Sequence, residues 1–286
     1  LTPPRIGCHV SIAEGVSKAI ERAEARECEC IQIFTTSPRV WAHATHAAEE
    51  VAGFRAGVAR LGLVPIVVHA SYLLNMASPD EGLRARSVAL LSATARWSAE
   101  LGASAVVIHP GSCADFDGGG CVSRVAETLR AAFAEWPAGV ALALEQSAGG
   151  PTTVGGRFEH LMDIIAALGG DARLRVWLDT AHAFSAGYDL AHPEGIDRLV
   201  ADVRRTAGWD RVAGVHANDS KEPLGSRRDR HENIGEGLIG REGFRLLLRH
   251  EAFRGLPFLL ETPGFDGEGP DLENMTRLKQ LRDATG

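Results

Sequence analysis

A short charged stretch, GSRRDRHENIGEG at residues 225–237, holds side chains that could do chemistry together. Asp229 and His231 stand two positions apart, and a carboxylate and an imidazole so close in sequence can share a divalent metal ion. The guanidinium groups beside them could hold phosphate through charge-assisted hydrogen bonds; they belong to Arg227, Arg228 and Arg230. A solvated loop of mixed charge would look the same, so the rest of the chain must decide between the two interpretations.

Further imidazoles and carboxylates stand at the C-terminal ends of short apolar runs. They are His9, His69, His109, Glu145, Asp179, His182, His216 and Glu261. A single buried histidine is an ordinary hydrogen-bonded core residue, but a carboxylate such as Glu145, after the apolar letters ALAL, is strongly disfavoured in the interior unless it is paired. Six successive runs end in this way, which favours one shared site over coincidence.

Eight apolar runs carry these side chains, and their composition is typical of parallel strands buried on both faces. They span residues 5–11, 30–36, 65–71, 105–111, 141–147, 175–182, 212–219 and 257–264. Helix-like segments lie between them, for example 80–101 and 122–135. We therefore predict an α/β fold, one (β/α)8 TIM barrel forming a single domain over residues 1–286, with a doubly wound open sheet as the alternative. In a barrel all strand ends meet at one face, so the candidate side chains would converge.

The composition is that of a globular protein, with 286 residues of which 45% are hydrophobic and 23% charged. No apolar run approaches the ~18 residues that a membrane span needs, and the N-terminal letters LTPPRIG lack the pattern of a secretory signal. Five cysteines without a C-x-x-C pair argue for a reducing compartment and against a disulfide framework or a thiolate zinc site. We therefore expect a cytoplasmic protein that does not bind membranes.

Imidazole and carboxylate ligands without thiolates suit Zn²⁺ or Mn²⁺ in a catalytic role. The candidate ligands are His69, His109, Glu145, Asp179, His182, His216, Asp229, His231 and Glu261. A catalytic zinc takes about three protein ligands, so a set of this size implies three divalent ions per chain.

The net charge of −7 by itself speaks against a nucleic-acid partner, because DNA-binding proteins usually carry a basic excess. Three divalent ions would offset most of that charge and would concentrate positive charge in the pocket, beside Lys221 and the three arginines. Such a site attracts phosphate. Paired metal ions can also hold a hydroxide and stabilise both the attacking and the leaving oxygen of a phosphodiester.

At these residues the chain resembles the endonuclease IV family of apurinic/apyrimidinic endonucleases. The motifs that carry the resemblance are EQSAGG (145–150), LDTAHAFSAGYD (178–189) and HANDSKEPLGSRRDRHENIGEG (216–237). The resemblance implies a (β/α)8 barrel with a trinuclear zinc cluster at its C-terminal face. It also implies a substrate, duplex DNA with an abasic site, which is cut on the 5′ side of the lesion to leave a 3′-hydroxyl. The family also trims blocked 3′ ends.

The resemblance also distributes the ligands among three zinc ions. His69, His109 and Glu145 would bind the first. Glu145 would bridge to a second, which Asp179, His216 and Glu261 would complete, and both glutamates would thereby be catalytic. The third ion would belong to His182, Asp229 and His231. His9 is not a ligand in the family pattern, so we expect it to support the site or the core.

Two further stretches resemble the loops with which the family reads DNA. HASYLLN (69–75) would use Tyr72 and Leu73 as a wedge in the base stack, and FTTSPRVW (34–41) would insert Arg39 from the opposite loop. Lys221 and the arginines of the opening stretch would contact phosphates. The chain departs from the family at Gln146 and Ser147, and Pro38 stiffens the arginine loop.

Two other functions are compatible with parts of this pattern. A sugar isomerase or epimerase of the same barrel superfamily would also place His, Glu and Asp at strand ends, but around one metal ion, without need of His182 or of the Asp229–His231 pair. A catalytically inactive DNA-binding or scaffold protein would not need so many compatible ligands. We therefore predict a monomeric, metal-dependent DNA-repair nuclease.

Overall fold

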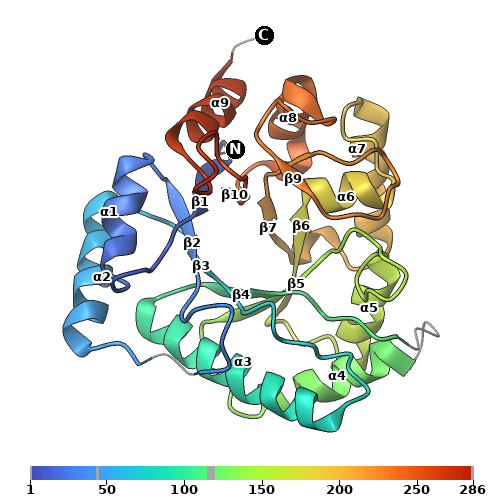
Figure 1. The fold of residues 1–286 in the computed structure, drawn as a ribbon. Coiled ribbons are helices and arrows are strands. Elements are labelled where there is room, and N and C mark those ends of the chain that lie inside the picture. The colour runs from blue at the N-terminus through green and yellow to red at the C-terminus, as the bar shows by residue number, and fades with distance from the viewer. Residues whose placement is uncertain (1, 43–44, 115–119, 285–286) are drawn as a thin grey trace.

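The computed structural model describes residues 2–42, 45–114 and 120–284, and in them eight parallel strands close into a barrel (Figure 1). The strands are β1 (Arg5–His9), β2 (Cys30–Ile33), β3 (Ile66–His69), β4 (Ala105–Ile108), β5 (Ala141–Glu145), β6 (Leu174–Asp179), β7 (Val212–His216) and β10 (Pro257–Leu260). Around the barrel they follow the order β1, β10, β7, β6, β5, β4, β3, β2. Seven predicted runs contain one of these strands, and β6 begins one residue before its run, so the barrel is confirmed and the open sheet is wrong.

Helices surround the barrel and connect its strands (Figure 1). They are α1 (Lys18–Ala25), α2 (Ala48–Leu61), α3 (Glu81–Leu101), α4 (Gly120–Phe133), α5 (Phe158–Ala167), α6 (Thr180–Ala186), α7 (Pro193–Arg205), α8 (Gly240–Arg249) and α9 (Leu272–Asp283), with short 3₁₀ turns η1 (Trp209–Arg211) and η2 (Glu251–Phe253). The segments predicted at 80–101 and 122–135 are α3 and α4. Asp80 caps α3 by accepting a hydrogen bond from the Leu83 N–H at 3.2 Å, which starts the helix where the prediction placed it.

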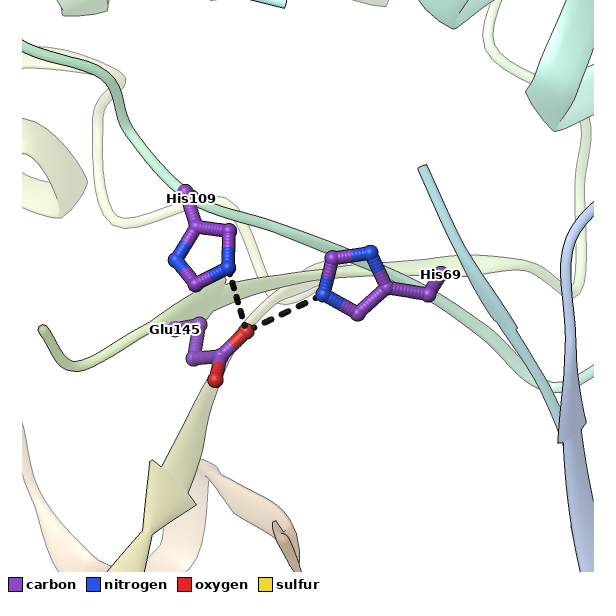
Figure 2. Close-up of side chains that lie close together, drawn as sticks. All are labelled: His69, His109 and Glu145. Atoms are coloured by element: carbon purple, nitrogen blue, oxygen red, sulfur yellow. Dashed lines mark hydrogen bonds and ion pairs between the residues drawn. The ribbon is translucent and has the colours of Figure 1, made fainter. Parts of the chain in front are cut away.

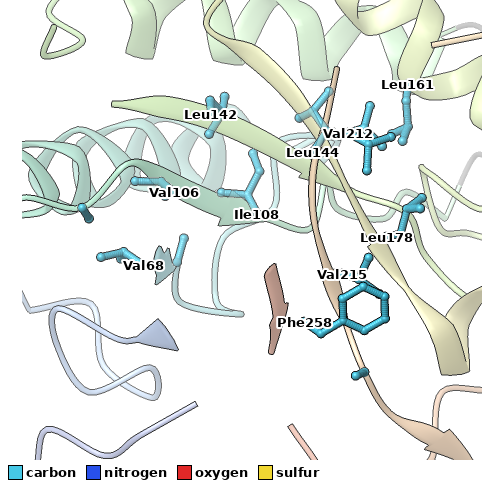
Figure 3. Packing of buried hydrophobic residues seen from close by; sticks show 14 of the residues in the cluster. Val68, Val106, Ile108, Leu142, Leu144, Leu161, Leu178, Val212, Val215 and Phe258 are labelled. Atoms are coloured by element: carbon cyan, nitrogen blue, oxygen red, sulfur yellow. The ribbon is translucent and has the colours of Figure 1, made fainter. Parts of the chain in front are cut away.

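The strands are apolar throughout because both of their faces are buried. In β4, Val107 points into the barrel and packs with Trp177, whereas Val106 packs outward in the layer beneath the helices. Figure 3 shows part of that outer layer, in which Val106 lies in register with Leu142 of the neighbouring strand. Burying each such side chain is worth about 1.5–3 kcal/mol, so the two layers fix the strand positions firmly.

The Trp177 indole crosses the barrel interior, and Gly214 on the adjacent strand makes this possible. A Cβ atom at Gly214 would lie 2.2 Å from the indole ring. The packing of Trp177 in the barrel interior therefore depends on the absence of a side chain at Gly214 of β7.

A two-stranded antiparallel ribbon lies outside the barrel sheet and follows β7 in sequence. It consists of β8 (Asp219–Ser220) and β9 (His231–Glu232), in which Ser220 pairs with His231. We call residues 219–239, which contain this ribbon, the arm. The arm contains the charged stretch of residues 225–237.

A disulfide joins Cys113, which follows β4, to Cys121 in the first turn of α4. The expectation that this cysteine set forms no disulfide is therefore wrong for one pair, while Cys8, Cys28 and Cys30 are free thiols. Cysteine number and spacing could not reveal this pair, because its formation depends on Cα atoms that the fold brings to 6.4 Å. None of the helices in the described ranges combines the length and apolar character of a membrane span.

Candidate metal centre

The C-terminal ends of the strands bring the predicted ligands to one face of the barrel. His69, Glu145, Asp179 and His216 are the last residues of β3, β5, β6 and β7, while His109 and Glu261 directly follow β4 and β10. Ligand atoms lie within 4.8 Å of one another in three groups. The groups are His69–His109–Glu145, Glu145–Asp179–His216–Glu261 and Asp179–His182–His231.

The first group lies between β3, β4 and β5 (Figure 2). The Oε2 atom of Glu145 is 3.2 Å from Nε2 of His69 and 3.5 Å from Nε2 of His109. The other ring nitrogen of His69, Nδ1, donates to the Ala70 carbonyl at 2.7 Å, so Nε2, which faces Glu145, is the atom placed to act as a ligand. Two imidazoles and a carboxylate thus surround one point.

The second group is built around His216. Its Nδ1 atom lies 3.0 Å from Glu145 Oε1, 3.5 Å from Glu261 Oε2 and 3.9 Å from Asp179 Oδ2. The Asn218 amide donates to Asp179 Oδ2 at 2.7 Å, and its oxygen accepts from the Glu261 N–H at 2.8 Å. Asn218 therefore orients one candidate ligand directly and fixes the backbone of another.

The third group consists of His182 on α6, His231 on the arm and Asp179 at the end of β6. The carboxylate of Asp229 lies between two imidazoles, with Oδ2 3.1 Å from His182 Nε2 and Oδ1 3.1 Å from His231 Nε2. Asp179 Oδ2 also approaches His231 Nε2, at 3.6 Å. The family resemblance assigned Asp179 to the second ion alone, whereas here it lies beside both groups, as Glu145 does for the first and second.

Opposite charges at the strand ends keep the buried carboxylates ionised. Burial alone would raise the pKa of Glu145, but the imidazoles of His109 and His216 hold it well below its usual range. Burial also opposes the charge of Glu261, yet the charges of His216 and His69 lower its pKa to about 2. Conversely, burial would lower the pKa of His69, but the hydrogen bond to Glu145 and the charge of Glu261 raise it to about 9. The protein alone therefore balances these charges with protons on imidazole, which a divalent ion would replace.

In the third group, which we call the arm group, nearby carboxylates likewise keep an imidazole protonated, although its residues on the arm are less buried. Burial would lower the pKa of His231, but the charges of Asp179 and Asp229 raise it to about 9. The Asp229 side chain is 51% exposed and that of His182 only 3%. The exposed carboxylate of Asp229 thus lies between the buried imidazole of His182 and the partly buried imidazole of His231.

The buried Nε2 atom of His231 tests whether a metal ion fits this centre. Although it faces two carboxylates at 3.1 and 3.6 Å, it makes no hydrogen bond within the described part of the chain. Its Nδ1 atom already meets the Glu261 carbonyl at 3.2 Å. A buried ring nitrogen that faces two carboxylates without a hydrogen bond is placed to become a ligand when a divalent ion replaces its proton, so the residues fit such an ion.

A buried carboxylate that the sequence analysis overlooked, Asp219, holds the arm in place. Its oxygens accept hydrogen bonds from backbone N–H groups of the arm and of α8, belonging to Ser220, Gly235, Gly237, Ile239 and Gly240. A Cβ atom at Gly237 would lie 2.5 Å from Asp219 Oδ1, so the backbone must approach this closely. A second polar residue directly after a candidate strand end, as in VHAND, was the available signal for such a support.

The predicted DNA-contacting side chains lie around the metal groups. Tyr72 is 55% exposed, and its hydroxyl accepts a hydrogen bond from Arg39 Nε at 3.2 Å. Leu73 is half-buried beside it. The Phe34 ring packs edge-on against both Tyr72 and His69, with centroid distances of 6.4 and 5.8 Å. One aromatic ring thus connects the predicted wedge with a candidate ligand.

The basic side chains of the arm are exposed but not equally free. Lys221 pairs with Glu232 at 3.6 Å and Arg228 with Glu222 at 3.4 Å. Arg230 donates to the Asp229 carbonyl at 2.5 Å, and Arg227 is also exposed. The prediction that these four contact DNA stays a prediction.

A closed barrel with carboxylates and imidazoles gathered at the C-terminal ends of its strands defines a metal-dependent barrel enzyme. Residues 20–282 match the family model described as "Xylose isomerase-like TIM barrel". "Probable endonuclease 4" of Chloroflexus aggregans is 39% identical over 97% of this chain and 98% of its own length, and that of Haloarcula marismortui is 39% identical over 97% and 99%. The chain belongs to the endonuclease IV family.

The solved structures agree with this assignment. Endonuclease IV from Thermus thermophilus matches with a TM-score of 0.84 and 38% identity over 98% of both chains. A D-tagatose 3-epimerase-like protein has a TM-score of 0.71 over 97% and 96% of the two chains, but its identity of 21% makes it a likeness of fold alone. The predicted family is therefore confirmed.

Proposed function

We propose that the chain is an apurinic/apyrimidinic endonuclease that hydrolyses the phosphodiester on the 5′ side of an abasic site in duplex DNA and leaves a 3′-hydroxyl. Its centre would hold three divalent metal ions, with zinc as the expected ion. The observation that carries the proposal is the set of three ligand groups, joined by the shared carboxylates of Glu145 and Asp179.

The distribution of side chains gives each group a role. His69 and His109 would hold one ion with Glu145, while His216 and Glu261 would hold the next; Glu145 and Glu261 would thus act at the reacting phosphate. The third ion would lie with His182, Asp229 and His231. When bound, such ions neutralise the charge that develops on a phosphodiester and activate a water molecule for attack.

The residues at the rim would select the substrate. An exposed Tyr72 ring, steadied by Phe34 and by the hydrogen bond from Arg39, can fill the gap in the base stack where a base is missing. An abasic nucleotide costs least to extrude, because no base must be unpaired. Leu73 would join this wedge, and Lys221, Arg227, Arg228 and Arg230 would contact phosphates.

The same site would also trim blocked 3′ ends, because that reaction cleaves the same type of bond. The described part of one chain supplies all the candidate ligands, so the proposed centre needs no second copy, and we propose that the chain acts as a monomer. We propose that it acts on chromosomal DNA in the cytoplasm.

A nicking assay with parallel elemental analysis tests the proposal. The purified, active protein should contain about three zinc or manganese ions per chain and cut an abasic duplex but not an intact one. Glu261→Gln keeps the shape of the side chain but removes a ligand charge, so cleavage should fall while binding of abasic DNA persists. One ion per chain, with activity on ketoses and none on DNA, would favour the isomerase alternative instead.

A further inference from the structure

Strands β1 and β2 contribute no candidate metal ligand, yet each places a polar side chain beneath the centre. His9 ends β1, Gln32 lies in β2, and the two residues are paired in the strand register. Gln32 has no exposed surface at all. An amide this deep in a barrel needs partners for its donor and acceptor atoms.

Gln32 finds those partners among the candidate ligands. Its Nε2 atom lies 2.5 Å from Glu261 Oε1 and 3.1 Å from His9 Nδ1. Its Oε1 atom lies 2.8 Å from His216 Nε2. One side chain therefore touches two members of the second ligand group.

The chemistry of the carboxylate determines which way the amide points. An ionised carboxylate can only accept hydrogen bonds, so the NH₂ group of Gln32 must face Glu261. The amide oxygen then faces His216, and it can only accept, so Nε2 of His216 must carry the proton. That leaves Nδ1, the atom nearest Glu145, Glu261 and Asp179, as the nitrogen that can bind a metal ion.

We infer that Gln32 is a positioning residue of the metal centre, which sets the tautomer of His216 and holds Glu261, with His9 supporting the amide from below. This inference rests on the proposed metal centre. The neighbouring partners of metal-bound imidazoles orient them and commonly affect metal affinity by about 10–100-fold.

His216 differs in this respect from three other candidate ligands. The outward-facing nitrogens of His69, His182 and His231 meet backbone carbonyls of Ala70, Gln146 and Glu261. A side-chain substitution leaves those carbonyls in place. The partner of His216 is a side chain, so its role can be removed by mutation.

Gln32→Leu tests the inference, because it keeps a similar volume and removes both hydrogen-bonding atoms. Gln146→Leu is the matched control: Gln146 is equally buried and stands beside Glu145, but its side-chain amide donates to the Ser147 carbonyl instead of to a candidate ligand. Metal-free protein is titrated with Zn²⁺ against a chromophoric chelator. We expect one ion in Gln32→Leu to bind about 10–100-fold more weakly and the others to bind as in wild type, with no change in the control.

Nitrogen-15 NMR of the imidazoles in zinc-loaded protein provides a readout that general loosening would not imitate. Wild type should show a protected proton on His216 Nε2. Gln32→Leu should lose that protection, whereas Gln32→Glu, which keeps an oxygen facing His216, should retain it. If Gln32→Leu is too unstable to purify, the wild-type and Gln32→Glu spectra still decide the tautomer.

The outcomes separate this inference from the proposed function. Wild-type zinc affinity in a folded Gln32→Leu protein, or a His216 proton on Nδ1, would overturn the role of Gln32 while leaving the nuclease intact. A wild-type protein that binds no zinc and does not nick abasic DNA would refute the proposed function itself.

Discussion

The candidate ligands on the strands and those on the arm differ in how the fold holds them. Glu145 and His216 have side-chain exposures of 1% and 0%, and each stands at the end of a strand paired on both sides. Asp229 and His231, on the arm, have side-chain exposures of 51% and 20%. The strand ligands owe their positions to the whole barrel, whereas the arm ligands owe theirs to a few local contacts.

Those local contacts can be named. Asp219 binds the backbone of the arm from inside, and Ser185 of α6 holds its outer part by accepting from the Arg227 N–H at 2.9 Å and donating to the Arg228 carbonyl at 2.8 Å. The arm group should therefore be the part of the centre that can be weakened separately. The predictions on Glu145, Asp229 and Asp219 test that contrast directly, and the other two test the rim and the charge balance of the centre.

The largest effect should come from a strand ligand. Glu145→Gln removes a charge shared by two ligand groups, so about two ions per chain should be lost. Cleavage should fall by at least ~10²–10³-fold, the scale of losing one electrostatic contact to a developing charge. Asp229→Asn, on the arm, should lose only about one ion. Elemental analysis and nicking rates check both variants, and equal metal loss in the two would abolish the contrast.

Tyr72→Ala should weaken DNA binding without touching the metal centre. Loss of stacking worth ~1–3 kcal/mol corresponds to roughly 5- to 150-fold weaker binding of abasic duplex. Metal content should stay unchanged because no ligand is removed. Titrations of abasic and intact duplex at one salt concentration measure the effect, and an equal loss on both DNAs would mean that Tyr72 only packs.

Asp219→Asn should loosen the arm alone. The introduced NH₂ group would face backbone donors, so the arm ion should bind about 10–100-fold more weakly while the strand ions remain. Gly237→Ala, which pushes a Cβ atom against the same carboxylate, should act in the same direction. Asp80→Asn, at the distant cap of α3, is the control. If Asp219→Asn lost the ions held by the strand ligands before the ion of the arm, the arm could not be weakened separately from the rest of the centre.

The smallest effect should be a pH dependence confined to chelator-treated protein. The pKa values of His69 and His231 are raised to about 9, above the unfolded value near 6.5. Their stabilising contribution is therefore complete below pH ~6.5 and is lost as pH rises through ~9. The melting temperature of metal-free protein should fall over that range, whereas zinc-loaded protein should stay level. If the melting temperature of the metal-free protein did not change over this pH range, the pairing of His69 and His231 with carboxylates would be contradicted.

Much of the fold and the site could be predicted because both follow from strand ends. Runs that are apolar on both strand faces predicted the barrel, and charged residues at their ends, such as Glu145, predicted side chains that the structure brings together as candidate ligands. The supports could not be predicted in the same way. Gln32 acts through contacts with side chains of other strands, and the Cys113–Cys121 pair depends on Cα atoms that the fold brings together, so periodicity contains no signal for them. For Asp219 the only signal was the polar residues that follow the β7 run.

The closure of the barrel between β1 and β10 has a consequence for how the protein folds. The hydrogen bond between Gln32 and Glu261 joins residues 229 positions apart, across that closure. Contacts of such long range form late, because the loop entropy must be lost before they contribute. The second ligand group is then complete only when the last strand docks. Metal ions would therefore enter a finished barrel instead of directing its assembly, and the rate of zinc uptake by refolding protein would report the final step of folding.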